Sequence, residues 1–288
     1  MQKLDKPTQL WIDNYNTVKS KQAALTSYNR LVKYLDESNK SINDWIKEMN
    51  ESEDSKYKQL NLFCKSLGLM PASVKNYYAF VKSYLRVVHR IKTDIEDQKQ
   101  FIKFKPIEKI DREPISKDII KDFCMSSNQV FRTFLLIQSS SGMRATESLG
   151  LEKENFEFYN GITIIRIPAH LTKTKKERIT FISKEAQSNL DKCFYDYFQP
   201  KNLNSIEWYF WKLRKTLGYM ERYSNSVNYK INIHSLRAFT RTQAGKVNQD
   251  FAEALLGHQG YLRQYVRLEK EEMISYYKKL EPKLRIFN

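Results

Sequence analysis

The 288-residue sequence has no apolar run approaching the roughly 20 residues that a membrane-spanning helix needs. Its N-terminus, MQKLDKPTQLWIDNYN, also lacks the apolar stretch of a signal peptide. We therefore expect a soluble, cytoplasmic protein. The content of 41% hydrophobic and 13% aromatic residues excludes a disordered chain, and the length favours two domains.

Cysteine and histidine are scarce and scattered along the chain. The three cysteines never occur in a metal-ligand spacing, and neither do the four histidines. The sequence therefore predicts a reduced protein with no zinc site, no other metal and no cofactor. These residues are Cys64, Cys124, Cys193, His89, His170, His234 and His258.

Negative charge is in short supply, because 33 acidic residues face 49 basic ones and leave a net charge of +16. Such an excess favours a polyanionic partner, with nucleic acid first and an anionic membrane surface second. A generally lysine-rich proteome is the ordinary alternative. Charge alone says nothing about chemistry.

The patterns predict a mainly α-helical protein with a small antiparallel β-sheet. Residues 1–100 are predicted to form a helical domain, the proline-containing stretch 101–116 a linker, and residues 117–288 a second domain. In the second domain, NFEFYNGITIIRIP predicts two strands, because Asn160-Gly161 favours a type I′ hairpin turn. ERITFIS predicts a third strand after the basic loop AHLTKTKK.

One helix of the first domain, PASVKNYYAFVKSYLRVVHRIK, predicts a buried stripe on one side and a basic stripe on the other. The basic stripe is either a solvated face or a surface laid against a DNA backbone. Its members are Lys75, Lys82, Arg86 and Arg90.

Four short segments of the second domain carry groups suited to chemistry. SGMRATESLGL places Arg144 where a loop enters a helix, with Glu147 one turn later to orient it. KTKKERITF places Lys173 in a loop between strands, and HSLR places His234 and Arg237 at a helix start. LLGH, with a histidine behind a glycine, completes the set. Taken singly, each has an ordinary interpretation, such as a surface ion pair or a helix end.

Taken together and in this order, the four segments resemble the tyrosine recombinases, a family that includes the phage integrases and Xer-like recombinases. The resemblance covers residues 115–277, and the first domain is similar in kind to that family's helical, SAM-like core-binding domain. It implies a two-domain, site-specific DNA recombinase or integrase that acts on duplex DNA as a homo-tetramer on paired sites. The segment GYLRQYVRLEKEEMISYYKKLEPKL looks most like integrases of archaeal viruses and proviruses.

The chemistry of strand exchange explains why such residues occur together. A tyrosine phenol attacks the scissile phosphate and keeps the bond energy in a 3′-phosphotyrosyl ester. Two permanently charged arginine forks, here Arg144 and Arg237, suit the charge that develops on the phosphate oxygens. By the resemblance, Lys173 is the general acid, while His234 and His258 handle the tyrosine proton or bind the phosphate.

Some assignments stay open between neighbours. Lys175 and Lys176 are alternatives to Lys173, or they contact the DNA backbone, and Arg241 is either a DNA contact or a surface charge. By the resemblance, Tyr265 is the nucleophile, although it follows the GH histidine more closely than in Xer-like relatives; Tyr261 is too close.

Tyr276 and Tyr277 are the alternative nucleophiles, and they sit among apolar residues that favour packing in the core or on a partner. The last helix docks either on its own subunit or on a neighbour. Rival functions are a type IB topoisomerase, a catalytically inactive DNA-binding regulator and a metal-dependent nuclease.

Overall fold

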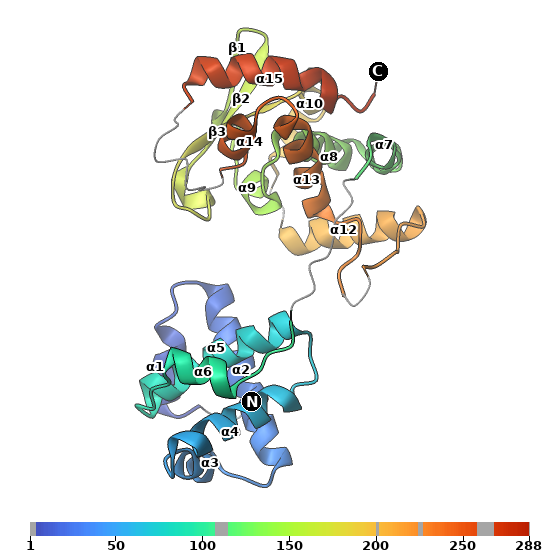
Figure 1. Cartoon of the computed structure of the whole chain (residues 1–288). Helices are drawn as coiled ribbons and strands as arrows, with labels where there is room; N and C mark the ends of the chain where they lie inside the picture. Colours follow the sequence, from blue (N-terminus) through green and yellow to red (C-terminus); the bar gives the residue numbers. More distant parts are fainter. Residues whose placement is uncertain (1–3, 107–114, 200–201, 224–226, 258–267, 288) are drawn as a thin grey trace. The chain divides into compact units, whose positions relative to one another are not determined.

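The computed structural model describes residues 4–106, 115–199, 202–223, 227–257 and 268–287 (Figure 1). The chain divides into two compact units, Met1–Lys109 and Ile110–Asn288. None of the described helices is long and apolar enough to cross a membrane. All three cysteines are buried as free thiols.

The N-terminal unit consists of six helices around an aromatic core. The helices are α1 (Lys6–Asp13), α2 (Val18–Glu37), α3 (Ile42–Met49), α4 (Glu53–Ser66), α5 (Pro71–Val88) and α6 (Ile95–Phe101). α5 packs on α1 and α2, and its predicted buried stripe is confirmed by Tyr78, Val81 and Leu85. Ile102 and Phe104, which follow α6, also contact this core. The domain limits and the linker at 101–116 stay predictions, because residues 107–114 lie outside the described residues.

The C-terminal unit combines nine α-helices, two short 3₁₀ helices and a sheet in its described part. Its first half contains α7 (Lys117–Met125), α8 (Gln129–Ser141), α9 (Ala145–Leu149), η1 (Lys153–Asn155), β1 (Phe156–Tyr159), β2 (Ile162–Ile167), η2 (Ala169–Leu171) and β3 (Arg178–Ile182). Its second half contains α10 (Lys184–Asp191), α11 (Phe194–Tyr197), α12 (Leu203–Thr216), α13 (Ile233–Gly245), α14 (Gln249–Leu256) and α15 (Lys270–Leu284).

The three strands form one antiparallel sheet in the order β1-β2-β3, with Phe156 opposite Ile165 and Ile165 opposite Thr180. Asn160 and Gly161 at the β1–β2 turn have φ of 50° and 77°. A type I′ turn requires positive φ at both positions, so the predicted hairpin is confirmed. The mainly helical fold with a small antiparallel sheet is confirmed as well.

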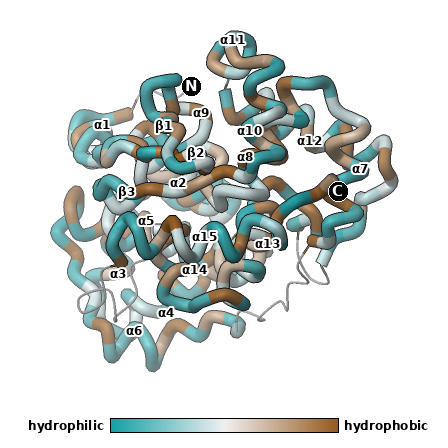
Figure 2. Tube along the Cα trace, turned by 90° about the horizontal axis from the view of Figure 1, so that it is seen from above, coloured by the Kyte–Doolittle hydropathy of each residue, from teal (hydrophilic) through white to brown (hydrophobic). Residues whose placement is uncertain are grey.

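α8 is the central helix of the C-terminal unit, with α7, α10, α13, α15 and β3 packed around it (Figure 1). Hydrophilic and hydrophobic stretches alternate along the outer helices (Figure 2), as expected where one face is buried. α8 begins at the Asn128 cap, whose Oδ1 accepts from the Phe131 N–H at 2.9 Å, and it ends at Gly142 with φ 64°. The chain leaves this buried helix at the position where Arg144 follows.

Candidate active site

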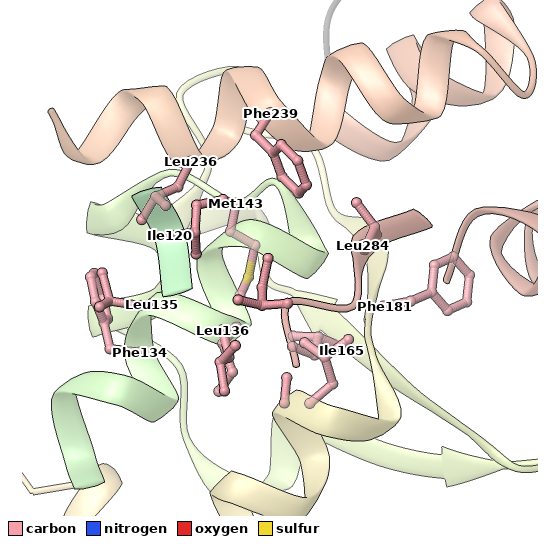
Figure 3. Close-up of a cluster of buried hydrophobic side chains, with 14 of the residues drawn as sticks. Ile120, Phe134, Leu135, Leu136, Met143, Ile165, Phe181, Leu236, Phe239 and Leu284 are labelled. Atoms are coloured by element: carbon pink, nitrogen blue, oxygen red, sulfur yellow. The ribbon is translucent and has the colours of Figure 1, made fainter. Parts of the chain in front are cut away.

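Arg144 lies in the turn between α8 and α9 and is held there by the core. Met143 before it is fully buried, in the cluster that Leu236 and Phe239 of α13 enter (Figure 3). Arg144 donates from its backbone N–H to Oε2 of Glu147 and from Nη1 to Oε1, both at 2.8 Å. The expected pairing with Glu147 is therefore present. The Arg144 side chain stays 28% exposed, so part of its guanidinium can contact a ligand.

Glu147 is a fully buried carboxylate that contacts a second arginine. Arg178, the first residue of β3, donates from Nη2 to Oε2 of Glu147 and from Nη1 to the Leu255 carbonyl, each at 2.6 Å. Burial by itself raises the pKa of Glu147, but Arg178 and the bonds from Arg144 outweigh it and hold that pKa below its usual value. Glu147 is thus negatively charged and shared by two cations.

Arg237 lies in α13 with only 3% of its surface exposed. Its Nη1 donates to the Gly142 carbonyl, and its Nη2 donates to the Leu256 carbonyl at 2.7 Å. Burial lowers the pKa of Arg237, and the positive charges of Arg144 and Arg178 lower it further. Arg237 bonds the Gly142 carbonyl, two residues before Arg144, so both arginines lie at the turn between α8 and α9.

Arg144 and Arg178 both pair with the buried Glu147 carboxylate, and the negative charges of Glu147 and Glu253 act on Arg237. Positive charges gathered in one place attract an anion. Planar guanidinium forks match the geometry of phosphate oxygens. The arrangement is therefore suited to bind a phosphate group.

The two other described catalytic candidates, His234 and Lys173, are both exposed. His234 occupies the first turn of α13, one turn before Arg237, and lines a hollow of about 550 Å³ together with Arg214 and Tyr229. Lys173 lies exposed in the loop between β2 and β3. His258, Tyr261 and Tyr265 lie outside the described residues.

The neighbouring lysines of that loop have backbone contacts. Lys175 has φ 54°, and its Nζ donates to the His170 carbonyl at 3.3 Å. Lys176 donates its backbone N–H to Oγ1 of Thr172 at 3.1 Å. Thr172 is buried and so fixes the start of the loop.

Tyr277, one of the two alternative nucleophiles, is packed in the core. It is completely buried, donates its hydroxyl to the Ser140 carbonyl at 3.1 Å, and stacks on Phe181 with 4.9 Å between ring centroids. Tyr276 is half-buried and stacks on Phe251. The core packing expected for both tyrosines is present, and in this single chain α15 packs on α8, α13 and α14.

The basic residues predicted to contact DNA differ in exposure. Lys75, Arg86 and Arg90 are exposed on the N-terminal unit, whereas Lys82 is half-buried and donates to Oε1 of Gln98 at 3.1 Å. Arg241 is half exposed and pairs with Glu253 at 2.7 Å. This ion pair favours the interpretation of Arg241 as a surface charge.

The sequence alone did not predict that Arg178 belongs to this cluster. It also did not predict the three backbone carbonyl groups that accept hydrogen bonds from Arg178 and Arg237. The signal available was position in the strand, because alternation places Arg178 on the same face as Thr180 and Ile182. An arginine at an inward position of a buried strand needs a partner. The carbonyls of Gly142, Leu255 and Leu256 have no sequence signal.

Comparison with known proteins identifies the class. The profile of the phage integrase family matches residues 115–272, more than half of the chain. A lambda integrase dimer, residues 75–356, bound to a COC' core site has a TM-score of 0.61 and 16% identity, covering 91% of this chain and 98% of that one. The integrase of transposon Tn1549, in complex with circular intermediate DNA, has a TM-score of 0.58 and 13% identity over 93% and 97% of the chains.

The XerH site-specific recombinase bound to its difH substrate has a TM-score of 0.52 and 20% identity, over 76% of this chain and 69% of that one. No curated protein matches the sequence. The structural likenesses show a tyrosine recombinase fold. The chain belongs to the phage integrase family, whose members are tyrosine recombinases that cleave and rejoin DNA.

Proposed function

We propose that this protein is a site-specific recombinase, an integrase, that cuts and rejoins strands of duplex DNA through a covalent 3′-phosphotyrosyl intermediate. The observation that carries the proposal is a cluster of three arginines: Arg144 and Arg178 bond the buried carboxylate of Glu147, and Arg237 bonds the Gly142 carbonyl beside Arg144. Such a cluster binds an anion, and the family membership makes that anion a DNA phosphate.

In this proposal Tyr265 attacks the scissile phosphorus, and Arg144 and Arg237 stabilise the charge on the nonbridging oxygens. The bond from phosphorus to the 5′ oxygen breaks, and Lys173 supplies the proton to that oxygen. His234 and His258 accept the tyrosine proton or donate to the phosphate. The released 5′-hydroxyl of a partner strand then attacks the phosphotyrosine and frees the enzyme.

We further propose that both units bind duplex DNA and that four copies act on paired sites. A lambda integrase tetramer bound to a Holliday junction resembles this chain with a TM-score of 0.61. The N-terminal unit serves as core-binding domain through Lys75, Lys82, Arg86 and Arg90. The likeness of residues 260–284 to integrases of archaeal viruses and proviruses suggests integration of a mobile element.

The test is trapping on a nicked suicide substrate, in which the short fragment carrying the 5′-hydroxyl diffuses away. The protein is expected to form a covalent adduct that peptide mapping places on Tyr265. Tyr265→Phe abolishes it, while the matched Tyr276→Phe and Tyr277→Phe variants retain it. Adduct on another tyrosine overturns the assignment of Tyr265 alone.

Three other outcomes overturn the proposed function. Tight DNA binding without any adduct indicates an inactive regulator. Relaxation of plasmids that lack a specific site, without recombinant product, indicates a topoisomerase. Cleavage that is lost in EDTA and leaves no tyrosyl ester indicates a metal-dependent nuclease.

A further inference from the structure

Arg178 is a buried, paired arginine of the cluster, and the mechanism above gives it no role. Its side chain is 6% exposed and joins two helices, since Nη2 bonds Glu147 in α9 and Nη1 bonds the Leu255 carbonyl at the end of α14. We infer that Arg178 is a positioning residue that keeps the Arg144 guanidinium available for the DNA phosphate. This inference rests on the proposed function.

The division of the Glu147 oxygens carries the inference. Oε1 accepts one bond, from Nη1 of Arg144, while Oε2 accepts from the backbone N–H of Arg144 and from Nη2 of Arg178. Arginine and carboxylate otherwise favour a two-pronged pair, in which two nitrogens face two oxygens. Because Arg178 occupies Oε2, the Arg144 guanidinium bonds Glu147 through Nη1 alone, and Glu147 does not engage its other donors.

The charges work in the same direction. A buried carboxylate with a single cation nearby attracts that cation strongly. Arg178 lowers the pKa of Glu147, which keeps it ionised, and neutralises much of the attraction that Glu147 exerts on Arg144. Without Arg178, Glu147 and Arg144 would close into a two-pronged pair and the phosphate would have to compete for the fork.

Arg178 also lies against the end of α14, where Arg237 is bonded. A Cβ added to Gly257 would lie 2.5 Å from Cδ and 2.7 Å from Nε of Arg178, so the guanidinium stem occupies the space a side chain would need. Arg178 bonds the Leu255 carbonyl, and Arg237 bonds the next carbonyl, that of Leu256. Arg178 thus ties the Arg144 turn to the same helix end that holds Arg237.

The experiment measures single-turnover adduct formation on the nicked substrate at saturating enzyme, alongside DNA affinity and thermal unfolding. Arg178→Met is expected to slow adduct formation about a hundredfold, which is the effect on rate that a misplaced catalytic group has. The DNA affinity is expected to change less than about threefold, because many other phosphate contacts contribute to it. Arg178→Lys, which keeps a donor for Oε2, is expected to recover part of the rate. The matched control Arg166→Met removes an exposed arginine of β2 that pairs with Glu157, and it leaves the rate unchanged.

A double-mutant comparison separates positioning from simple support of the fold. In a Glu147→Gln background no carboxylate competes for Arg144, so Arg178→Met should slow adduct formation less than it does in the native background. An equal slowing in both backgrounds overturns the inference, as does a native rate per folded molecule in Arg178→Met. If Arg178→Met does not fold, Arg178→Lys is compared in the native and Glu147→Gln backgrounds instead, and the same outcomes support or overturn the inference. Absence of adduct with the unsubstituted protein overturns the proposed function, and the inference with it.

Discussion

The two units of the molecule present their basic side chains in contrasting ways. On the N-terminal unit, Lys75, Arg86 and Arg90 are exposed along and just beyond α5. In the C-terminal unit, Arg178 and Arg237 are buried, and their donors are directed at the carboxylate and carbonyls described above. A long exposed side chain can reach a phosphate in several conformations, so another basic residue can take its place. A buried guanidinium contributes a fixed geometry, which a different cation cannot reproduce.

The largest expected difference between the units concerns a change that keeps the charge. Arg237→Lys should slow single-turnover adduct formation about 10²–10³-fold, because one ammonium group cannot bond the Gly142 and Leu256 carbonyls together and also support the phosphate. Arg86→Lys on the N-terminal unit should leave the rate unchanged. Similar rates for the two variants would remove the distinction between fixed and mobile cations.

A second comparison uses two glycines with left-handed backbone. Gly257 has φ +70° and the close Arg178 contact, whereas Gly68 of the N-terminal unit has φ +57° and no atom within 4 Å of an added Cβ. Gly68→Ala should cost about 1–2 kcal/mol of unfolding free energy from the backbone alone. Gly257→Ala should cost about 1–3 kcal/mol more, because Arg178 must move, and it should also slow adduct formation. Denaturant unfolding measures both, and equal costs would show that the Arg178 contact is easily relieved.

A third variant tests what α15 contributes. Tyr277→Phe removes the hydroxyl bonded to the Ser140 carbonyl and should lower stability by about 1 kcal/mol. The adduct rate and its mapping to Tyr265 should not change, since the ring still stacks on Phe181. A large decrease in rate at unchanged stability would place Tyr277 in the chemistry after all.

Local signals in the sequence were sufficient for much of the fold. Asn160-Gly161 specifies its turn through two positive φ angles, and the α5 stripe follows from helical period, so both could be predicted. The Arg144–Glu147 pair is also local, three residues apart. The bonds of Arg178 span 31 residues to Glu147 in α9 and 77 to Leu255 in α14, and only the folded chain brings these elements to β3. No periodicity contains that information, and for the same reason Lys173 could be placed in its loop but not relative to the arginines.

The smallest effects are expected where the N-terminal unit meets DNA. Replacing Lys75, Arg86 or Arg90 singly by alanine should weaken binding modestly and reduce the slope of log affinity against log salt by about 0.9 for each phosphate that is no longer neutralised. The adduct rate at saturating DNA should stay the same, because none of the three lies in the arginine cluster. Lys33→Ala, which removes an exposed lysine of α2 that lies 3.6 Å from Glu37, is the matched control and should leave the slope unchanged. If Lys33→Ala changes the slope as much as Arg86→Ala does, the basic face of α5 is a solvated surface and the unit binds DNA elsewhere.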